Sequence, residues 1–108
     1  MAIDHLQRAR RAWPILVRRA RNHQRPLTYG QLCSRMGLHW RAAQWFLGVI
    51  QNHCRRNGLP ALQALAVNKA THVPGKGYVG SARSRAAHQR ELRKVYRHGQ
   101  RWPVQAPF

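Results

Sequence analysis

Acidic residues are almost missing from this sequence, which has Asp4 and Glu91 against 20 Lys and Arg residues. The formal charge is +18 at pH 7. Ion pairs within the chain cannot neutralise such a surface, so a polyanionic partner is expected. The scarcity of acids also leaves no paired carboxylates for acid–base catalysis and no acidic ligands for a hard metal ion. We therefore expect a protein that is not an enzyme.

Cysteine is equally scarce, with Cys33 and Cys54 alone in the chain. Both fall among apolar neighbours on predicted helix faces, so we expect buried free thiols and no disulfide framework. The seven His residues do not combine with either Cys at the spacing of a zinc site. The sequence therefore predicts no metal and no cofactor.

Long apolar runs are absent as well. A helix that spans a bilayer needs about 18 or more consecutive apolar residues, and the sequence has no such stretch. A charged start followed by an apolar block, typical of a signal peptide, is also missing. These features predict a cytoplasmic protein, nucleoid-associated if it is bacterial, with no membrane partner.

Arginine is what the sequence has in excess, since 17 of its 20 cations are Arg. The planar guanidinium binds phosphate through two parallel hydrogen bonds and stacks on bases, which the Lys ammonium cannot do. This bias favours a nucleic-acid partner over a cationic surface that serves only solubility or membrane contact. With 108 residues, 44% of them hydrophobic, the chain can form one domain around a single core.

The strongest local pattern predicts a helix-turn-helix over residues 28–57. Thr28 and Gln31 have the spacing of a capping box, which begins a short helix. Gly37 can end that helix in the left-handed conformation. A longer second helix is expected from about His39 to Arg56, the usual position of a recognition helix.

The second helix has two distinct faces in its sequence pattern. Its predicted core residues are Ala43, Phe46, Leu47, Ile50 and Cys54. Its predicted outer residues are Arg41, Gln44, Gly48, Gln51 and Arg55. Trp40 and Trp45 fit either the core or a surface that stacks on bases.

A small β-hairpin is predicted after the helix-turn-helix. Residues 62–67 alternate as in a short strand, and a loop rich in Asn, Pro and Gly follows. Residues 78–79 can return as a second strand. This hairpin, over residues 62–79, would be a wing whose Lys69 and Lys76 reach phosphates.

Basic helices are predicted at both ends of the chain. Residues 3–11 show helical spacing, and Pro14 is expected to begin a separate helix over residues 14–23, because proline fits the first turn of a helix. The expected outward-facing residues of these segments are Arg8, Arg10, Arg11, Arg18, Arg19 and Arg21.

The C-terminal helix is predicted over residues 81–98, capped by Ser81 or Ser84. Residues 99–108 form a tail without periodicity. Trp102 either docks this tail on the core or leaves it loose.

Several short motifs occur in a fixed order between residues 26 and 80. They are Leu27-Thr28-Tyr29-Gly30-Gln31-Leu32, Gly37, Arg41-Ala42-Ala43, Pro60, Leu65-Ala66-Val67 and Gly77-Tyr78. In this order they resemble the DNA-binding region of the alkylguanine-DNA alkyltransferases and the alkyltransferase-like proteins, and the layout is also similar to that of small bacterial and phage proteins. The resemblance implies that Tyr29 lies against a DNA phosphate and that Arg41 enters the duplex where a damaged base is flipped out.

The sequence departs from that family where the family's chemistry resides. Residues 62–64 are Leu-Gln-Ala at the place of the reactive Cys. Cys33 and Cys54 lie elsewhere, without an evident base to activate a thiolate, so alkyl transfer is not expected. Gln44 and Trp45 replace the glycines that let the family's recognition helix approach the minor groove closely.

The sequence as a whole predicts a mostly α fold, a single winged-helix domain over residues 1–98 with basic terminal helices, that binds double-stranded DNA without catalysis. Its expected DNA-binding residues are Tyr29, Arg35, Trp40, Arg41, Gln44, Gln51, Arg55, Lys69 and Lys76. Two alternatives remain. One is an RNA-binding protein, and the other is a phage-type inhibitor or interaction module that acts on a nucleic-acid-binding protein partner.

Overall fold

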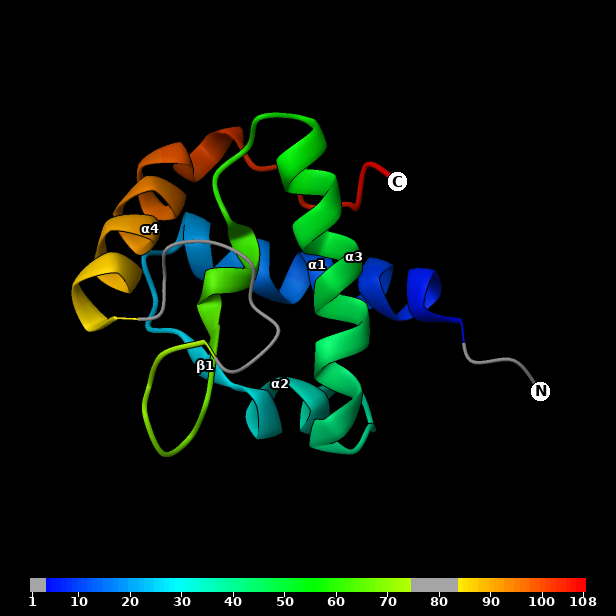
Figure 1. The fold of residues 1–108 in the computed structure, drawn as a ribbon. Helices are drawn as coiled ribbons and strands as arrows, with labels where there is room; N and C mark the ends of the chain where they lie inside the picture. Colours follow the sequence, from blue (N-terminus) through cyan, green and yellow to red (C-terminus); the bar gives the residue numbers. More distant parts are fainter. Residues whose placement is uncertain (1–3, 75–83) are drawn as a thin grey trace.

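The computed structural model describes residues 4–74 and 84–108 and is mostly helical (Figure 1). The helices are α1 (His5–Arg21), α2 (Tyr29–Arg35), α3 (Ala43–Arg56) and α4 (Arg85–His98), with the 3-10 helices η1 (Trp40–Ala42), η2 (Leu62–Leu65) and η3 (Gly99–Arg101). The strands β1 (Leu27–Thr28) and β2 (Ala66–Val67) form a small sheet. In Figure 1, α3 and α4 lie on two sides of the fold with α1 behind them. A mostly helical fold with a small sheet is thereby confirmed.

One continuous helix, α1, replaces the two helices predicted before residue 26, so Pro14 lies inside a helix instead of beginning one. Pro14 has no N–H to donate to the Arg10 carbonyl, which weakens the helix locally. Burial outweighs that loss, because one stripe of α1 is buried along its length. Its members are Ala9, Ala12, Trp13, Leu16, Val17 and Ala20.

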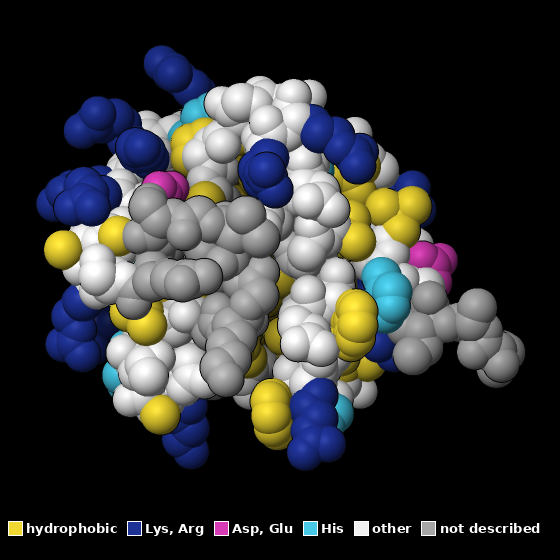
Figure 2. Space-filling view, in the orientation of Figure 1, with side chains coloured by type: hydrophobic (Ala, Val, Ile, Leu, Met, Phe, Trp, Pro, Cys, Tyr) yellow, Lys and Arg dark blue, Asp and Glu magenta, His cyan; other side chains and the backbone are white. Residues whose placement is uncertain are grey.

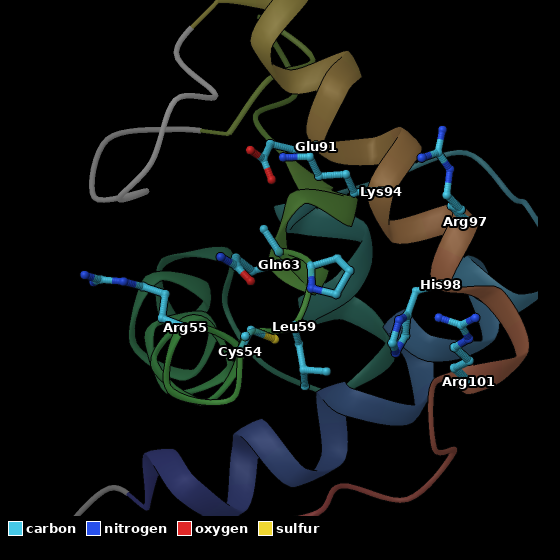
Figure 3. A pocket seen from close by; sticks show the side chains of 12 residues that line it. Cys54, Arg55, Leu59, Gln63, Glu91, Lys94, Arg97, His98 and Arg101 are labelled. Carbon is cyan, nitrogen blue, oxygen red and sulfur yellow. The ribbon is translucent and has the colours of Figure 1, made fainter.

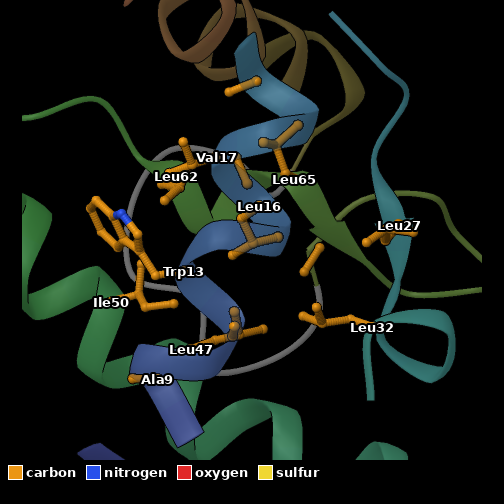
Figure 4. Close-up of a cluster of buried hydrophobic side chains, with 14 of the residues drawn as sticks. Ala9, Trp13, Leu16, Val17, Leu27, Leu32, Leu47, Ile50, Leu62 and Leu65 are labelled. Atoms are coloured by element: carbon orange, nitrogen blue, oxygen red, sulfur yellow. The ribbon is translucent and has the colours of Figure 1, made fainter. Parts of the chain in front are cut away.

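The hydrophobic core surrounds this stripe of α1 (Figure 4). Helix α3 packs on it with the five residues predicted for its inner face, and all of them are buried. That part of the prediction is confirmed. Cys33 and Cys54 are both buried and free, as predicted.

The two predicted helices around Gly37 are confirmed. The Thr28 hydroxyl accepts a hydrogen bond of 3.1 Å from the Gln31 N–H, and the Gln31 side chain accepts one of 3.0 Å from the Thr28 N–H. Gly37 has φ 70°, the left-handed conformation that ends α2. The second helix begins with a 3-10 turn at Trp40 and becomes α-helical at Ala43, slightly later than predicted.

The first strand of the predicted hairpin, residues 62–67, is wrong over most of its length. Residues 62–65 form the buried 3-10 helix η2, and only Ala66 and Val67 form a strand. That strand pairs in parallel with β1, Leu27 opposite Ala66. Parallel strands need a long crossover, and here α2 and α3 provide it. The predicted return strand, residues 78–79, and Lys76 lie outside the described residues.

Helix α4 begins at its cap Ser84, whose hydroxyl accepts a hydrogen bond of 3.1 Å from the Ala87 N–H. His88 is buried, and its Nε2 donates a hydrogen bond of 2.8 Å to the Ala64 carbonyl of η2. This bond fixes the first turns of α4 on the segment that leads into β2. Gly99, with φ 46°, ends the helix.

The C-terminal tail is docked on α1. Trp102 is buried, at 1% exposure. The indole Nε1 of Trp13 donates a hydrogen bond of 2.8 Å to the Pro103 carbonyl, and Arg10 Nε donates one of 2.8 Å to the Phe108 carbonyl. Of the two alternatives for the tail, the docked one is confirmed.

Candidate nucleic-acid interface

One face of α3, with the η1 turn before it, lies in solvent opposite the core. Its exposed side chains are Trp40, Arg41, Gln44, Trp45, Asn52 and Arg55. Trp40 and Trp45 are 54% and 57% exposed, so the core alternative is wrong for both. The face thus combines cations, amides and aromatic rings, the three side-chain types that contact phosphates and bases.

Gln51 was predicted for this face but is buried, at 7% exposure. It follows Leu47 by one helical turn and precedes Cys54 by three residues, and both of these are buried. Gln51 therefore lies at the edge of the inner face of α3. Asn52, which is not among the predicted residues, is exposed in its place.

Aromatic and cationic side chains form a cluster at the N-terminal end of α3. The Arg41 guanidinium carbon lies 5.4 Å from the centroid of the Trp40 ring, a cation–π contact. On the other side, Trp45 stacks on His5 of α1, with centroids 5.6 Å apart and planes at 22°. These contacts orient the two indoles while leaving more than half of each exposed. No local pattern could have paired His5 with Trp45, because they belong to different helices.

The other predicted site residues are spread along the motif. Tyr29, the first residue of α2, is half-buried, and Arg35, its last residue, is exposed. Lys69 is exposed in the turn after β2. Arg41 and Arg55 stand at opposite ends of the second helix, about 20 Å apart along its axis at 1.5 Å per residue. The predicted residues therefore form a long surface, not a compact pocket.

Three arginines of α1, predicted simply to face outward, make specific contacts within the protein. Arg11 Nη2 donates a hydrogen bond of 2.8 Å to the Met36 carbonyl at the end of α2. The Arg21 guanidinium donates two, of 2.7 and 3.1 Å, to Gln100 Oε1. Arg10 holds the last residue of the tail, as described above. Part of the Arg excess thus serves the fold, through carbonyl and amide acceptors, where acidic partners are scarce.

The thiols lie in apolar surroundings. Burial raises the pKa of Cys54 to about 11 and also raises the pKa of Cys33. Neither thiol forms much thiolate at neutral pH. Across residues 4–74 and 84–108, no three His, Cys, Asp or Glu side chains are placed to hold a metal ion. In the same ranges, no helix has both the length and the apolar character to cross a membrane.

Cationic side chains project in several groups, mostly around the edges of the visible face (Figure 2). They gather over α4 and near the C-terminal end of α3, while the two acids stand apart from each other. Comparison of the chain with protein-family models, with curated proteins and with solved structures gave no match.

Proposed function

We propose that this protein binds double-stranded DNA without catalysis, through the exposed face of α3 and the turn before it. The observation that carries this proposal is the division of α3 into a fully buried apolar face and an exposed face of Arg, Gln, Asn and Trp side chains. The chain's formal charge of +18 supplies the attraction to a polyanion. An exposed α-helix also has the width that the major groove of B-DNA admits.

The cations and amides of this face have different chemical roles in the proposal. Arg41 and Arg55 bind phosphates, one at each end of the helix. Gln44 and Asn52 carry amides that can read base edges, and adenine is the usual partner of such groups. Tyr29 and Lys69 extend the phosphate contacts to the sides of the motif.

Gly48 supports a close approach of α3 to its partner. It lies on the exposed side of the helix, and a Cβ added there would meet no atom within 4 Å beyond its chain neighbours and the adjacent backbone of its own helix. Internal packing therefore does not require glycine at this position, although glycine weakens a helix. A side chain is missing where the backbone would come nearest to DNA.

The resemblance to the alkyltransferase-like DNA-binding region agrees with this orientation. We assign Tyr29 and Arg41 to DNA on that basis, and the segment after β2, with Lys69, to a wing beside the duplex. Gln44 and Trp45 project from α3 where the family has glycines, so at these two residues the helix meets DNA at a greater distance than in that family. Gly48, one turn further along, permits the closer approach. With this function the protein would be located in the cytoplasm and associated with DNA.

The first test is the salt dependence of binding to a fluorescently labelled short duplex. If about six phosphates are neutralised, affinity should fall about a thousandfold between 50 and 200 mM salt. Arg41→Ala should weaken binding and lower the slope by about one phosphate. Arg18→Ala is the matched control, since Arg18 is exposed on the solvent side of α1. A flat salt profile, or equal effects of the two variants, would reject duplex binding by this face.

Competition with structured RNA tests whether the protein prefers duplex DNA or RNA. The major groove of A-form RNA is deep and narrow, so side chains on a helix cannot read it. At matched salt, duplex DNA should therefore displace the labelled DNA at lower concentration than duplex RNA of the same length. The opposite order would favour the RNA alternative.

A further inference from the structure

A cationic cleft adjoins the exposed face of α3 at Arg55 and lies between the C-terminal end of that helix and α4 (Figure 3). Its volume is about 660 Å³, which lies within the usual range for small-molecule sites. Its charged and polar lining consists of Arg55, Gln63, Glu91, Lys94, Arg97, His98 and Arg101.

The charges of the cleft come from separate elements. Arg55 belongs to α3, Lys94 and Arg97 to α4, and Arg101 to η3. Figure 3 shows Arg55 on one side of the cleft and Arg97 and Arg101 on the other. Four cations against the Glu91 carboxylate leave a formal charge of +3. A concave surface with an excess of one sign of charge focuses the field, so this cleft attracts an anion more strongly than cations spread over a convex helix do.

The floor of the cleft is neutral and has one unused hydrogen-bond acceptor. Leu59, Pro60 and Ala61 supply apolar surface beside the Gln63 side chain. Gln63 is buried at 4% exposure, and its Oε1 accepts no hydrogen bond. Buried polar atoms are almost always satisfied, so an unpaired acceptor in the lining of a cleft marks a place for a donor from a ligand.

His98 adds a second neutral polar group at the wall. Burial lowers the pKa of His98, and the charge of Arg101 lowers it further. The ring is therefore uncharged at neutral pH, and it lies against Trp102 with ring centroids 4.4 Å apart. The cleft thus has a cationic rim, a neutral wall and an acceptor in its floor.

We propose that this cleft binds a nucleotide phosphate monoester, either a free nucleotide or the phosphorylated end of a nucleic-acid strand. The doubly charged phosphate occupies the rim of Arg55, Lys94, Arg97 and Arg101, where Arg forms charge-assisted hydrogen bonds. The sugar and base cover the apolar floor, and an N–H of the base or an O–H of the sugar donates to Gln63 Oε1. Internal phosphodiesters bind less well, because they carry one charge and cannot enter a cleft end-on.

The experiment compares two matched pairs of probes by equilibrium binding to the full chain. One pair is a short blunt duplex with 5′-phosphates and the same duplex with 5′-hydroxyls, and the other is a nucleoside 5′-monophosphate and its nucleoside. Within at least one pair, the phosphorylated member should bind about tenfold more tightly. If the monophosphate competes as well as the phosphorylated duplex, the ligand is the free nucleotide; if only the duplex end binds, it is the strand end.

Two double variants of α4, each of which removes two positive charges, test whether the phosphate binds in the cleft. Lys94→Gln combined with Arg97→Gln should abolish the preference for the phosphorylated probe. Arg90→Gln combined with Arg93→Gln should retain it, because both residues are exposed but do not line the cleft. Gln63→Leu should weaken nucleotide binding without loss of folded protein.

Equal affinities for phosphorylated and hydroxyl probes would overturn the proposal, and so would equal effects of the two double variants. The α3 face is judged separately from binding of the 5′-hydroxyl duplex and its loss in Arg41→Ala. A failure of one site is therefore distinguishable from a failure of the other.

Discussion

The indole Nε1 of Trp13, in the middle of α1, donates a hydrogen bond of 2.8 Å to the carbonyl of Pro103, which lies 90 residues later in the chain. The Trp13 ring also packs edge-on against Trp102, with centroids 5.8 Å apart. One buried aromatic residue thus joins the first helix to the C-terminal segment. Trp102 therefore anchors the tail in the core.

Trp102→Ala should therefore lower the free energy of unfolding by about 3–5 kcal/mol, the usual loss for a buried Trp. The variant removes the contact with Trp13 and the hydrogen bond of 3.0 Å from Trp102 Nε1 to the Val95 carbonyl. Urea unfolding measures the effect. Gln105→Ala, in an exposed part of the same tail, is the control and should change stability by at most about 0.5 kcal/mol. Equal stabilities of the two variants would mean that the tail does not contribute to the core.

Pro14→Ala should increase stability, because α1 continues through this position. Alanine restores an N–H for the Arg10 carbonyl, which stabilises the helix. It also increases the conformational entropy of the unfolded chain, which lowers stability by a smaller amount, so the net gain should be about 2 kcal/mol. Pro26→Ala is an informative comparison, since Pro26 precedes β1 outside any helix. There the same change should decrease stability by about 0.5–1 kcal/mol. A decrease in the free energy of unfolding of both variants would show that Pro14 does not destabilise α1.

Local chemistry made much of this fold predictable. The capping box at Thr28 and Gln31, the turn at Gly37 and the inner face of α3 depend on residues within a few positions of each other. Such features follow from local backbone geometry and helical periodicity, which can be predicted from the residue types and their spacing in the sequence.

Features that depend on distant residues were not predictable in this way. Pro14 remains inside α1 because of burial against other elements, and β2 pairs with Leu27–Thr28 across α2 and α3. The side of α3 that buries Gln51 and exposes Asn52 is likewise set by tertiary packing. In the cleft, Gln63 and Arg101 come together only when α4 docks on η2.

The thiol of Cys54 should make stability decrease at high pH. Burial raises its folded pKa from 9.0 to about 11. Above pH 9 the unfolded chain loses this proton while the folded chain keeps it, so the free energy of unfolding falls as pH rises. Over the full interval the loss is about 2–3 kcal/mol.

Urea unfolding at several values of pH from 8 to about 11 measures this loss, with Cys54→Ala as the reference. The alanine variant is less stable at neutral pH because it leaves a small cavity, but its stability should depend less on pH. Other groups with raised pKa values, Cys33 and Tyr96, are common to both proteins and cancel in the difference. Parallel profiles for the two proteins would contradict the assignment.

Trp40 should matter for nucleic-acid binding and little for folding, since its ring is 54% exposed. Arg41 and His39 both lie near this ring, and its exposure still leaves aromatic surface for a base to stack on. Stacking is worth about 1–3 kcal/mol per base, so Trp40→Ala should weaken binding to a duplex with unpaired bases about 5- to 150-fold. Trp40→Phe should keep part of the affinity, because it keeps an aromatic face.

The two variants separate stacking from electrostatics, because neither changes the charge of the chain. Their salt slopes should equal that of the parent protein, whereas Arg41→Ala lowers it. The fully paired duplex is the reference probe, and Trp40→Ala should affect it less than the duplex with unpaired bases. Equal losses on both probes, or a large drop in unfolding free energy, would place Trp40 in the fold instead of at the interface.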